Sequence, residues 1–196
     1  MQVTLKFCNG VSAADWIVQA HIPWEQLVNF GPPDFPAYAR LRFIPDPTKP
    51  GQAEADANVA EDHPSDITQT RRALEHLRRF TSTPEDCYFC VWEGYGDLNV
   101  PPSVLDGSMV TIPHRRYFLF HGSLTDFGSW EETFGSVGDF PPAFAWPAGH
   151  SWCFTRDVDP HWAGIGAEQA AIDTLLNAPE LDVVPAQPAE PQATYY

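Results

Sequence analysis

Two cysteines, Cys87 and Cys90, stand three residues apart in an aromatic segment that runs from Asp86 to Asp97. A Cys-x-x-Cys pair supplies two of the four ligands of a structural zinc site, and at the start of a helix it can form a redox centre. The flanking residues are aromatic and β-branched, which favours a buried strand. Residues three apart on a strand point to opposite faces of the sheet. We therefore expect buried cysteines that hold neither a metal nor another cofactor.

The alternative is that these two cysteines belong to a metal site completed from the second half of the chain. No second Cys-x-x-Cys and no His-Glu-x-x-His motif is present. Asp157 and Asp159 lie close to one of the histidines, and such side chains can hold a metal that activates water. The alternative function is thus a metal-dependent enzyme or a zinc-stabilised domain. Its ligands would be Cys87 and Cys90 with members of the remaining set, which comprises Cys8, Cys153, His114, His121, His150 and His161.

Signatures of nucleophilic catalysis and of phosphate binding are incomplete. Gly-x-Ser-x-Gly is absent from the sequence. Gly164-Ile-Gly166 precedes a predicted helix, but position 169 is Gln, and Glu168 at the start of that helix would repel a phosphate. We interpret the two glycines as a tight strand-to-helix turn. Without a complete catalytic set, we expect a protein that is not an enzyme.

The formal net charge is −15, from 26 acidic and 11 basic residues. Such a charge opposes binding to nucleic acid or to an anionic membrane, and it favours a neutral or basic protein partner. Arg71 and Arg78, with Arg72 and Arg79 beside them, form stripes on one predicted helix. They could receive an acidic partner, but we favour pairing with the chain's own acidic loop between Glu54 and Asp66 or simple exposure to solvent.

Three tryptophans, Trp130, Trp146 and Trp162, lie in segments rich in glycine and proline. Exposed aromatic side chains on loops are typical contact anchors for a protein or a small ligand. Packing over the core is the alternative for each of them. The candidate binding residues are therefore these three tryptophans together with Arg71 and Arg78.

The cysteine content and the hydropathy pattern indicate a cytoplasmic protein. Four cysteines are few for 196 residues, which suggests free thiols in a reducing compartment. The first residues lack a basic segment followed by a long apolar one, so we expect no secretory signal. No run of 18 apolar residues predicts a transmembrane helix. The oligomeric state is left open.

The predicted order is roughly helix, strand, helix, three or four strands, helix and strand, with short helical segments expected at 13–18 and 23–28. A strand over 38–44 is followed by an acidic surface loop over 46–64. A helix then begins at Ser65 or Asp66, and its buried stripe contains Ile67, Thr70, Leu74, Leu77 and Phe80 or Thr81. The later predicted strands cover 87–92, 116–121, 151–155, 161–166 and 181–184, and the later helices cover 126–134 and 167–177.

Consecutive strands without intervening helices predict an α+β domain, with an antiparallel or mixed sheet and helices packed on one side. We expect a single domain over residues 1–184. Residues 185–196 are rich in proline, alanine and glutamine and are predicted to form a disordered tail. The expected core contains Leu41, Phe43, Leu74, Leu77, Phe89, Val91, Phe118, Phe120, Phe154 and Leu175.

Several blocks of the sequence resemble a group of uncharacterised cytoplasmic proteins of actinobacteria. The blocks lie at 23–28, 38–47, 87–94, 113–120 and 152–157. The similarity spans about residues 13–184 and implies a whole-chain domain rather than a reaction. Together with the acidity and the loop aromatics, these features favour a non-catalytic interaction protein, immunity- or adaptor-like, that binds a basic or neutral protein partner.

Overall fold

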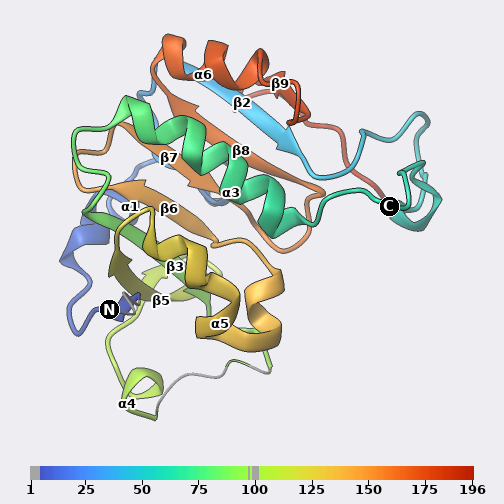
Figure 1. Ribbon diagram of the computed structural model, residues 1–196. Helices are drawn as coiled ribbons and strands as arrows, with labels where there is room; N and C mark the ends of the chain where they lie inside the picture. The colour runs from blue at the N-terminus through green and yellow to red at the C-terminus, as the bar shows by residue number, and fades with distance from the viewer. Residues whose placement is uncertain (1–4, 97, 99–101) are drawn as a thin grey trace.

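The computed structural model describes residues 5–96, 98 and 102–196 (Figure 1). The first four residues, which belong to the segment examined for a secretory signal, and Asp97, which ends the cysteine segment, lie outside the described residues. Within the described part, nine strands form one antiparallel sheet in the order β1-β5-β3-β6-β7-β8-β2-β9, and β4 pairs with β5. The strands are β1 (Lys6–Phe7), β2 (Ala37–Arg42), β3 (Cys87–Trp92), β4 (Val110–Ile112), β5 (Arg115–Gly122), β6 (Phe144–Pro147), β7 (Trp152–Thr155), β8 (Trp162–Ala167) and β9 (Val183–Pro185).

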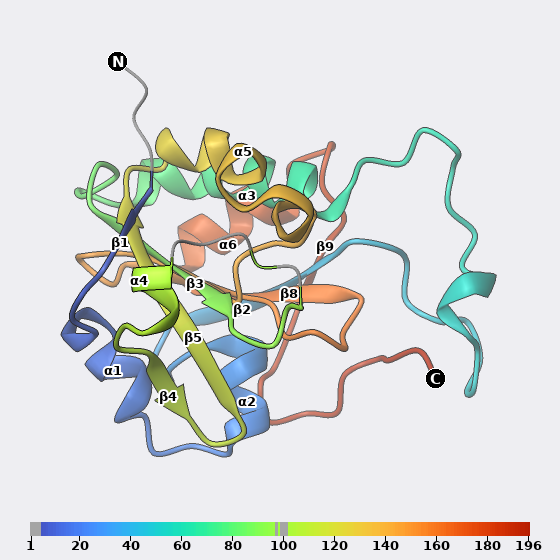
Figure 2. The ribbon, with the colours of Figure 1, turned by 90° about the horizontal axis from the view of Figure 1, so that it is seen from below.

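Helices lie on both faces of this sheet. The α-helices are α1 (Asp15–Val18), α2 (Trp24–Phe30), α3 (Asp66–Leu77), α4 (Pro102–Leu105), α5 (Trp130–Phe134) and α6 (Gln169–Leu176), and 3₁₀ turns cover Ser12–Ala14, Glu54–Asp56, Arg78–Phe80, Asp126–Ser129 and Gly135–Asp139. Figure 2 shows α3, α5 and α6 on one face, and α1 and α2 on the other. The predicted α+β class with an antiparallel sheet is confirmed. The expectation that helices pack on one side only is corrected, because the buried apolar residues of α1 and α2 cover the second face.

Helix α3 forms as its sequence predicts. Ser65 is the N-cap, and its hydroxyl oxygen accepts a hydrogen bond from the main-chain N–H of Thr68 at 3.4 Å. The predicted stripe, at helical spacing, is buried against the sheet except for Phe80, which is half-buried. The helix is therefore stabilised mainly by the packing of its apolar face against the sheet, because a helix of this length is only marginally stable on its own.

The core has two layers, one on each face of the sheet. Alternation along β3 divides its side chains, because Cys87, Phe89 and Val91 face the layer beneath α3 and α5, whereas Cys90 faces the layer beneath α1 and α2. Every residue of the predicted core is buried. The two layers explain why so many aromatic residues are accommodated in a chain of this length.

The Gly164–Gly166 segment is not a turn, contrary to the sequence interpretation. Both residues lie within β8. A Cβ atom at position 164 would stand 1.8 Å from the main-chain oxygen of Asn29, at the end of α2. The hydroxyl of Thr155 donates to the same oxygen at 2.7 Å. Glycine is thus needed here for the close approach of a helix backbone to the sheet.

Three strands were not predicted, and the most central of them is β6. It lies between β3 and β7, and proline residues stand just before it and at its last position. Proline argues against a central strand, because it lacks the N–H donor. Here the proline falls at the end of the strand. The predicted 126–134 helix is also divided into a 3₁₀ turn and α5.

The C-terminal residues differ from the predicted disordered tail. The structure places residues 186–196, which we call the tail, against the body of the protein, and the C-terminus lies beside the loop that follows β2 (Figure 1). The hydroxyl of Tyr195 donates to the carbonyl oxygen of Pro45 at 2.6 Å, and the indole N–H of Trp162 donates to that of Ala193 at 3.2 Å. Main-chain groups of the tail and the Tyr195 hydroxyl supply these contacts, which the average composition does not reveal.

Candidate functional site

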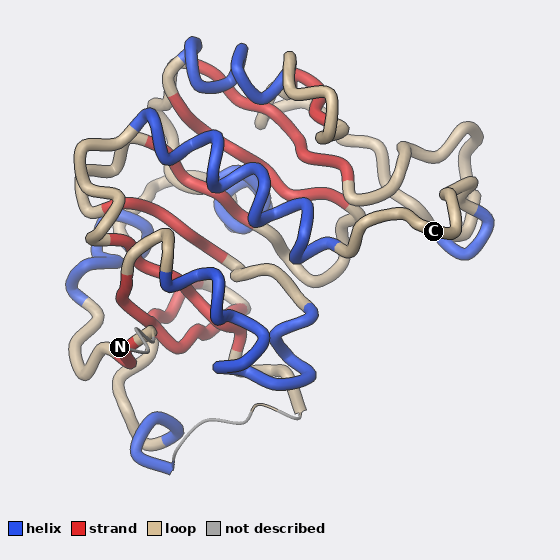
Figure 3. The backbone as a smooth tube through the Cα atoms, viewed as in Figure 1, coloured by secondary structure: helices blue, strands red, loops and turns tan. Residues whose placement is uncertain are grey.

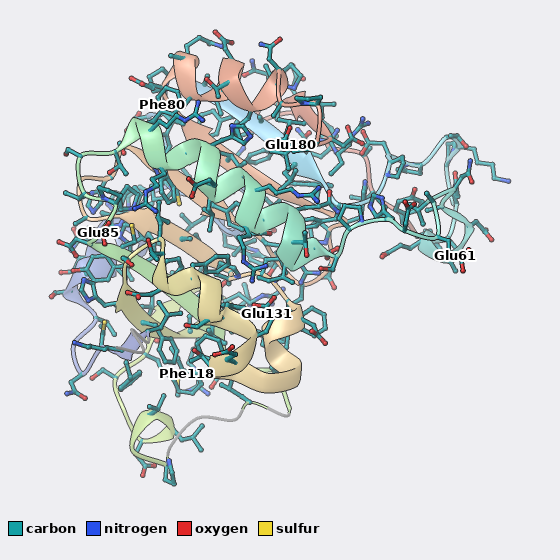
Figure 4. The ribbon with its side chains drawn as sticks, viewed as in Figure 1. Glu61, Phe80, Glu85, Phe118, Glu131 and Glu180 are labelled. Carbon is teal, nitrogen blue, oxygen red and sulfur yellow. The ribbon has the colours of Figure 1, made fainter. Side chains whose placement is uncertain are left out.

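Residues 46–64, between β2 and α3, form the most prominent projection of the molecule, and we call them the acidic arm. Figure 3 shows the arm as loop with one helical turn, and Figure 4 labels Glu61 near its outer end. Lys49 is the only lysine or arginine in this segment. The exposed carboxylates of the arm belong to Glu54, Asp56, Glu61 and Asp62. The arm thus concentrates negative charge on a surface that stands away from the sheet.

A buried ion network fixes the start of the arm. Asp46 accepts two hydrogen bonds from Arg40, Nη1 to Oδ1 at 2.8 Å and Nη2 to Oδ2 at 2.9 Å. It accepts a third from Arg42 at 3.0 Å, and its Oδ1 lies 3.0 Å from Nε2 of His161. Burial alone would raise the pKa of Asp46, but the hydrogen bonds from Arg40 and His161 outweigh it, and the pKa is held well below its usual range.

The partners of Asp46 come from β2, the strand next to the β9 edge of the sheet, and from the residue just before β8. The Arg40 side chain is only 9% exposed, and its guanidinium lies 5.3 Å from the centre of the Trp162 ring. The His161 side chain is 1% exposed, and burial lowers its pKa despite the nearby Asp46 carboxylate. The network therefore links β2, the entry to β8 and the arm.

The rest of the arm is held by hydrogen bonds between two glutamine side chains and main-chain groups. The buried Gln52 accepts from the main-chain N–H of Thr48 at 2.9 Å and donates to the carbonyl oxygen of Asp56 at 3.2 Å. At the other end, Gln69 donates to the carbonyl oxygens of Phe43 and Pro64, at 3.0 and 2.9 Å. The arm is consequently a shaped loop that is anchored at both ends.

The predicted binding arginines pair with acids of the same chain, one in α5 and one in the turn before β3. Arg71 lies 2.6 Å from Glu131 of α5, and Arg78 lies 3.2 Å from Glu85. Figure 4 labels both acids. The sequence offered the acidic loop as the intramolecular partner of the arginine stripe, and this is corrected for these two residues. The loop lies beyond the start of α3, whereas α5 runs alongside the helix.

The three predicted tryptophan anchors are buried, which corrects their interpretation as exposed contact residues. Trp130, Trp146 and Trp162 are 1%, 0% and 2% exposed. Trp130 packs with neighbouring phenylalanines beneath α5, and Trp146 stacks on Tyr88. These residues belong to α5, β6 and β8 rather than to loops, so their large apolar surfaces are used in packing. Of the three, only Trp162 lies under the tail.

The alternative metal ligands are not brought together. Cys87 and Cys90 face opposite core layers, His114 packs on Trp24 at 5.0 Å between ring centres, and His161 binds Asp46. Among residues 5–96, 98 and 102–196, no group of three His, Cys, Asp or Glu side chains could share a metal ion. Burial raises the pKa of Cys87 to about 12, with Asp86 adding to the effect, so this thiol is a poor ligand and nucleophile at neutral pH.

A second polar cluster, which was not predicted, lies at β4 and β5. The Arg115 guanidinium binds both carboxylate oxygens of Asp157 at 2.9 Å and lies between the rings of Trp24 and Trp92, at 5.5 and 5.7 Å. A cavity of 380 Å³ adjoins it. The charge of Arg115 is matched by Asp157, so the cluster ties β5 to the segment after β7. The sequence signal was the run of basic residues at 114–116, which had no obvious partner.

Comparison with protein-family models, with curated proteins and with solved structures finds no match to this chain. The resemblance to actinobacterial proteins therefore stays a prediction. In the part of the chain that the structure describes, no helix is long and apolar enough to cross a membrane. The site is thus defined by its own geometry, a charged arm on a fixed base.

Proposed function

We propose that this chain is a non-catalytic interaction protein, immunity- or adaptor-like, whose acidic arm binds a basic surface of a protein partner. The observation that carries the proposal is the anchored, projecting arm with its four exposed carboxylates. The pairing of Arg71, Arg78 and Arg116 with internal acids supports it, because these cations are already matched within the molecule. The chain then presents mainly negative charge to its surroundings.

The arrangement suits rapid and specific association. Charges on a projecting surface steer a partner of opposite charge before contact. A preformed loop loses less conformational entropy on binding than a disordered acidic segment would. The buried base supplies that order, since Asp46 and Gln69 hold the two ends of the arm and Gln52 ties together its first half. Binding by this surface should therefore weaken as salt is added.

The test is affinity capture from a lysate of the source organism, with isotope-labelled comparison of two neutralised variants. The arm variant carries E54Q, D56N, E61Q and D62N. The control carries E25Q, E75Q, D106N and E168Q, which removes the same charge from exposed positions elsewhere. We expect the arm variant to lose its specific basic partner by about tenfold or more, while the control keeps it, because only a local charge pattern fixes the docking surface. Equal recovery with both variants, or no partner above background with wild type, would contradict the proposal.

A further inference from the structure

A shallow groove with an aromatic floor crosses α2, β2 and β8, and the tail covers it. The floor consists of Phe30, Tyr38 and Trp162, which we call the aromatic groove. The ring centre of Phe30 lies 5.3 Å from that of Trp162 and 6.1 Å from that of Tyr38. Figure 2 shows the tail passing α2 on its way to the acidic arm. The groove is separate from the outer surface of the arm.

The tail lies on this groove chiefly through main-chain groups. The N–H of Ala186 donates to the carbonyl oxygen of Tyr38 at 3.0 Å, and the indole N–H of Trp162 donates to that of Ala193 at 3.2 Å. Between these points the chain turns, and the Gln192 amide donates to the carbonyl oxygens of Gln187 and Glu190 at 2.9 and 2.8 Å. The groove thus recognises backbone carbonyl and N–H groups more than particular side chains.

The fit between the tail and the groove is incomplete. Two cavities of 220 and 210 Å³ remain beneath the tail, and both are lined by Gln26, Phe30 and Pro188. The small side chains of the tail do not fill them, and most tail side chains stay exposed. Of the tail residues only Ala186 is buried, where it packs with Phe30 and Trp162, so release of residues 187–196 costs much less than unfolding of the sheet.

The chemistry of the groove matches a known mode of peptide recognition. Proline-rich segments dock on grooves lined by aromatic rings, because such segments are extended and lose little entropy on binding. Pro185, Pro188 and Pro191 are spaced by three residues, which is one turn of a polyproline II helix. In the tail this spacing is interrupted by the turn at 187–190. A separate peptide without that turn could place its prolines along the whole groove.

We propose that the aromatic groove is a binding site for a proline-rich, extended segment of another protein, and that the tail is a displaceable ligand supplied by the same chain. The site lies on a different surface from that of the proposed arm function, and does not depend on it. Displacement would also release the tail end from the base of the arm, where the N–H of Tyr196 donates to the carbonyl oxygen of Gln52 at 3.0 Å.

The competition between the tail and a free peptide sets the measurable effect. A tethered segment acts at an effective concentration in the millimolar range. A free peptide must displace it, so a tail whose own intrinsic Kd is roughly 100 µM lowers the apparent affinity of a competing peptide by about tenfold. Replacing the tail with an unrelated sequence of the same length should remove the competition and restore the intrinsic affinity of the groove for the free peptide.

The probe is a fluorescein-labelled peptide with the sequence of residues 184–196, titrated by fluorescence anisotropy. It is compared on wild type and on a full-length chain in which residues 187–196 are replaced by glycine and serine. We expect the replaced chain to bind the peptide about tenfold more tightly than wild type does. A peptide with its prolines changed to alanine should bind several-fold more weakly, since the extended conformation is then no longer favoured.

Two variants of the tail-replaced chain locate the site. Trp162→Phe removes the indole donor and should weaken binding by about fivefold to tenfold, the value of one hydrogen bond. Gln26→Trp fills the groove from its rim, at a half-buried helix position, and should abolish binding without altering the core. Circular dichroism and thermal melts establish that each variant is folded.

Three results would overturn the proposal. One is no peptide binding by a folded tail-replaced chain. Another is binding that neither Gln26→Trp nor the loss of prolines affects. The third is a wild-type dimer in analytical ultracentrifugation that disappears on tail replacement, because this would assign the groove to the tail of a second copy rather than to a foreign segment.

Discussion

Arg40 and Asp46 form a doubly hydrogen-bonded ion pair at the base of the acidic arm, with nitrogen–oxygen distances of 2.8 and 2.9 Å. Arg40 lies in the middle of β2, whereas Asp46 is part of the loop that follows. The pair therefore fixes the direction in which the polar loop leaves β2. Because the pair is largely buried, it stabilises the fold only while both partners are present, and loss of one leaves a buried charge without a partner.

Asp46→Asn should destabilise the fold by about 3 kcal/mol, because it leaves the buried guanidinium of Arg40 without a counter-charge. Asp182→Asn is the matched control, since Asp182 also binds an arginine of β2 but its side chain is 39% exposed. The control should cost less than about 1 kcal/mol, as exposed ion pairs do. Urea unfolding measures both values. Equal losses would mean that the Asp46 network is no more than a surface pair.

Acidification should weaken the protein in two separate windows. Burial lowers the pKa of His161 in the folded state, so the unfolded chain binds more protons between that pKa and about 6.5, and stability falls as the pH drops through this interval. The depressed pKa of Asp46 gives stability that is complete above about pH 4 and is lost as the pH falls further. Arg40, across Asp46 from the imidazole, adds to the cost of charging His161, whereas the carboxylates of Asp46 and Glu54 reduce that cost.

Thermal melts at pH 7.5 and 5.0 test the first window. His161→Gln should show a smaller loss of melting temperature on acidification than wild type, although its stability at pH 7.5 is lower. The exposed His21→Gln is the control and should keep the wild-type difference. If His161→Gln and wild type change by the same amount, another group governs the acid response.

Gly164→Ala should cost about 3 kcal/mol, since the new Cβ would stand 1.8 Å from the main-chain oxygen of Asn29, and overpacking against backbone is not readily relieved. Gly149→Ala is the control, because the nearest atom to its Cβ would be the Thr83 hydroxyl at 3.7 Å. The control should stay within about 0.5 kcal/mol of wild type. Chemical denaturation measures the free energy of unfolding of both variants. A Gly164→Ala variant as stable as wild type would contradict the tight contact between α2 and β8.

Cys87, Cys90 and Cys153 should react with a thiol reagent only after unfolding, because all three are buried and burial raises the pKa of each thiol. Half-buried Cys8, whose pKa burial raises to about 11, should react slowly in the folded protein. The Cys8→Ser variant should then show almost no native reaction. Two fast native thiols at 87 and 90, or one equivalent of zinc in untagged protein, would instead support the metal or redox interpretation.

Local sequence patterns determined much of the sheet and the longer helices. Alternation along β3 placed Cys87 and Cys90 on opposite faces, and the apolar stripe of α3 identified its buried side. These signals are local, because the periodicity of a strand or helix is written in adjacent residues. The same patterns could not identify β6, whose flanking prolines resemble a loop.

Only the tertiary structure decided the site. His161 meets Asp46 across 115 positions of sequence, and Arg71 pairs with Glu131 rather than with the acidic loop. Such contacts depend on the order of strands in the sheet, which single-residue propensities do not encode. The burial of Trp162 and the docking of the tail likewise depend on surfaces that exist only after β2, β8 and α2 have come together. Sequence fixes which residues prefer the interior or a strand, whereas the partners of a charged or aromatic group are set by the folded chain as a whole.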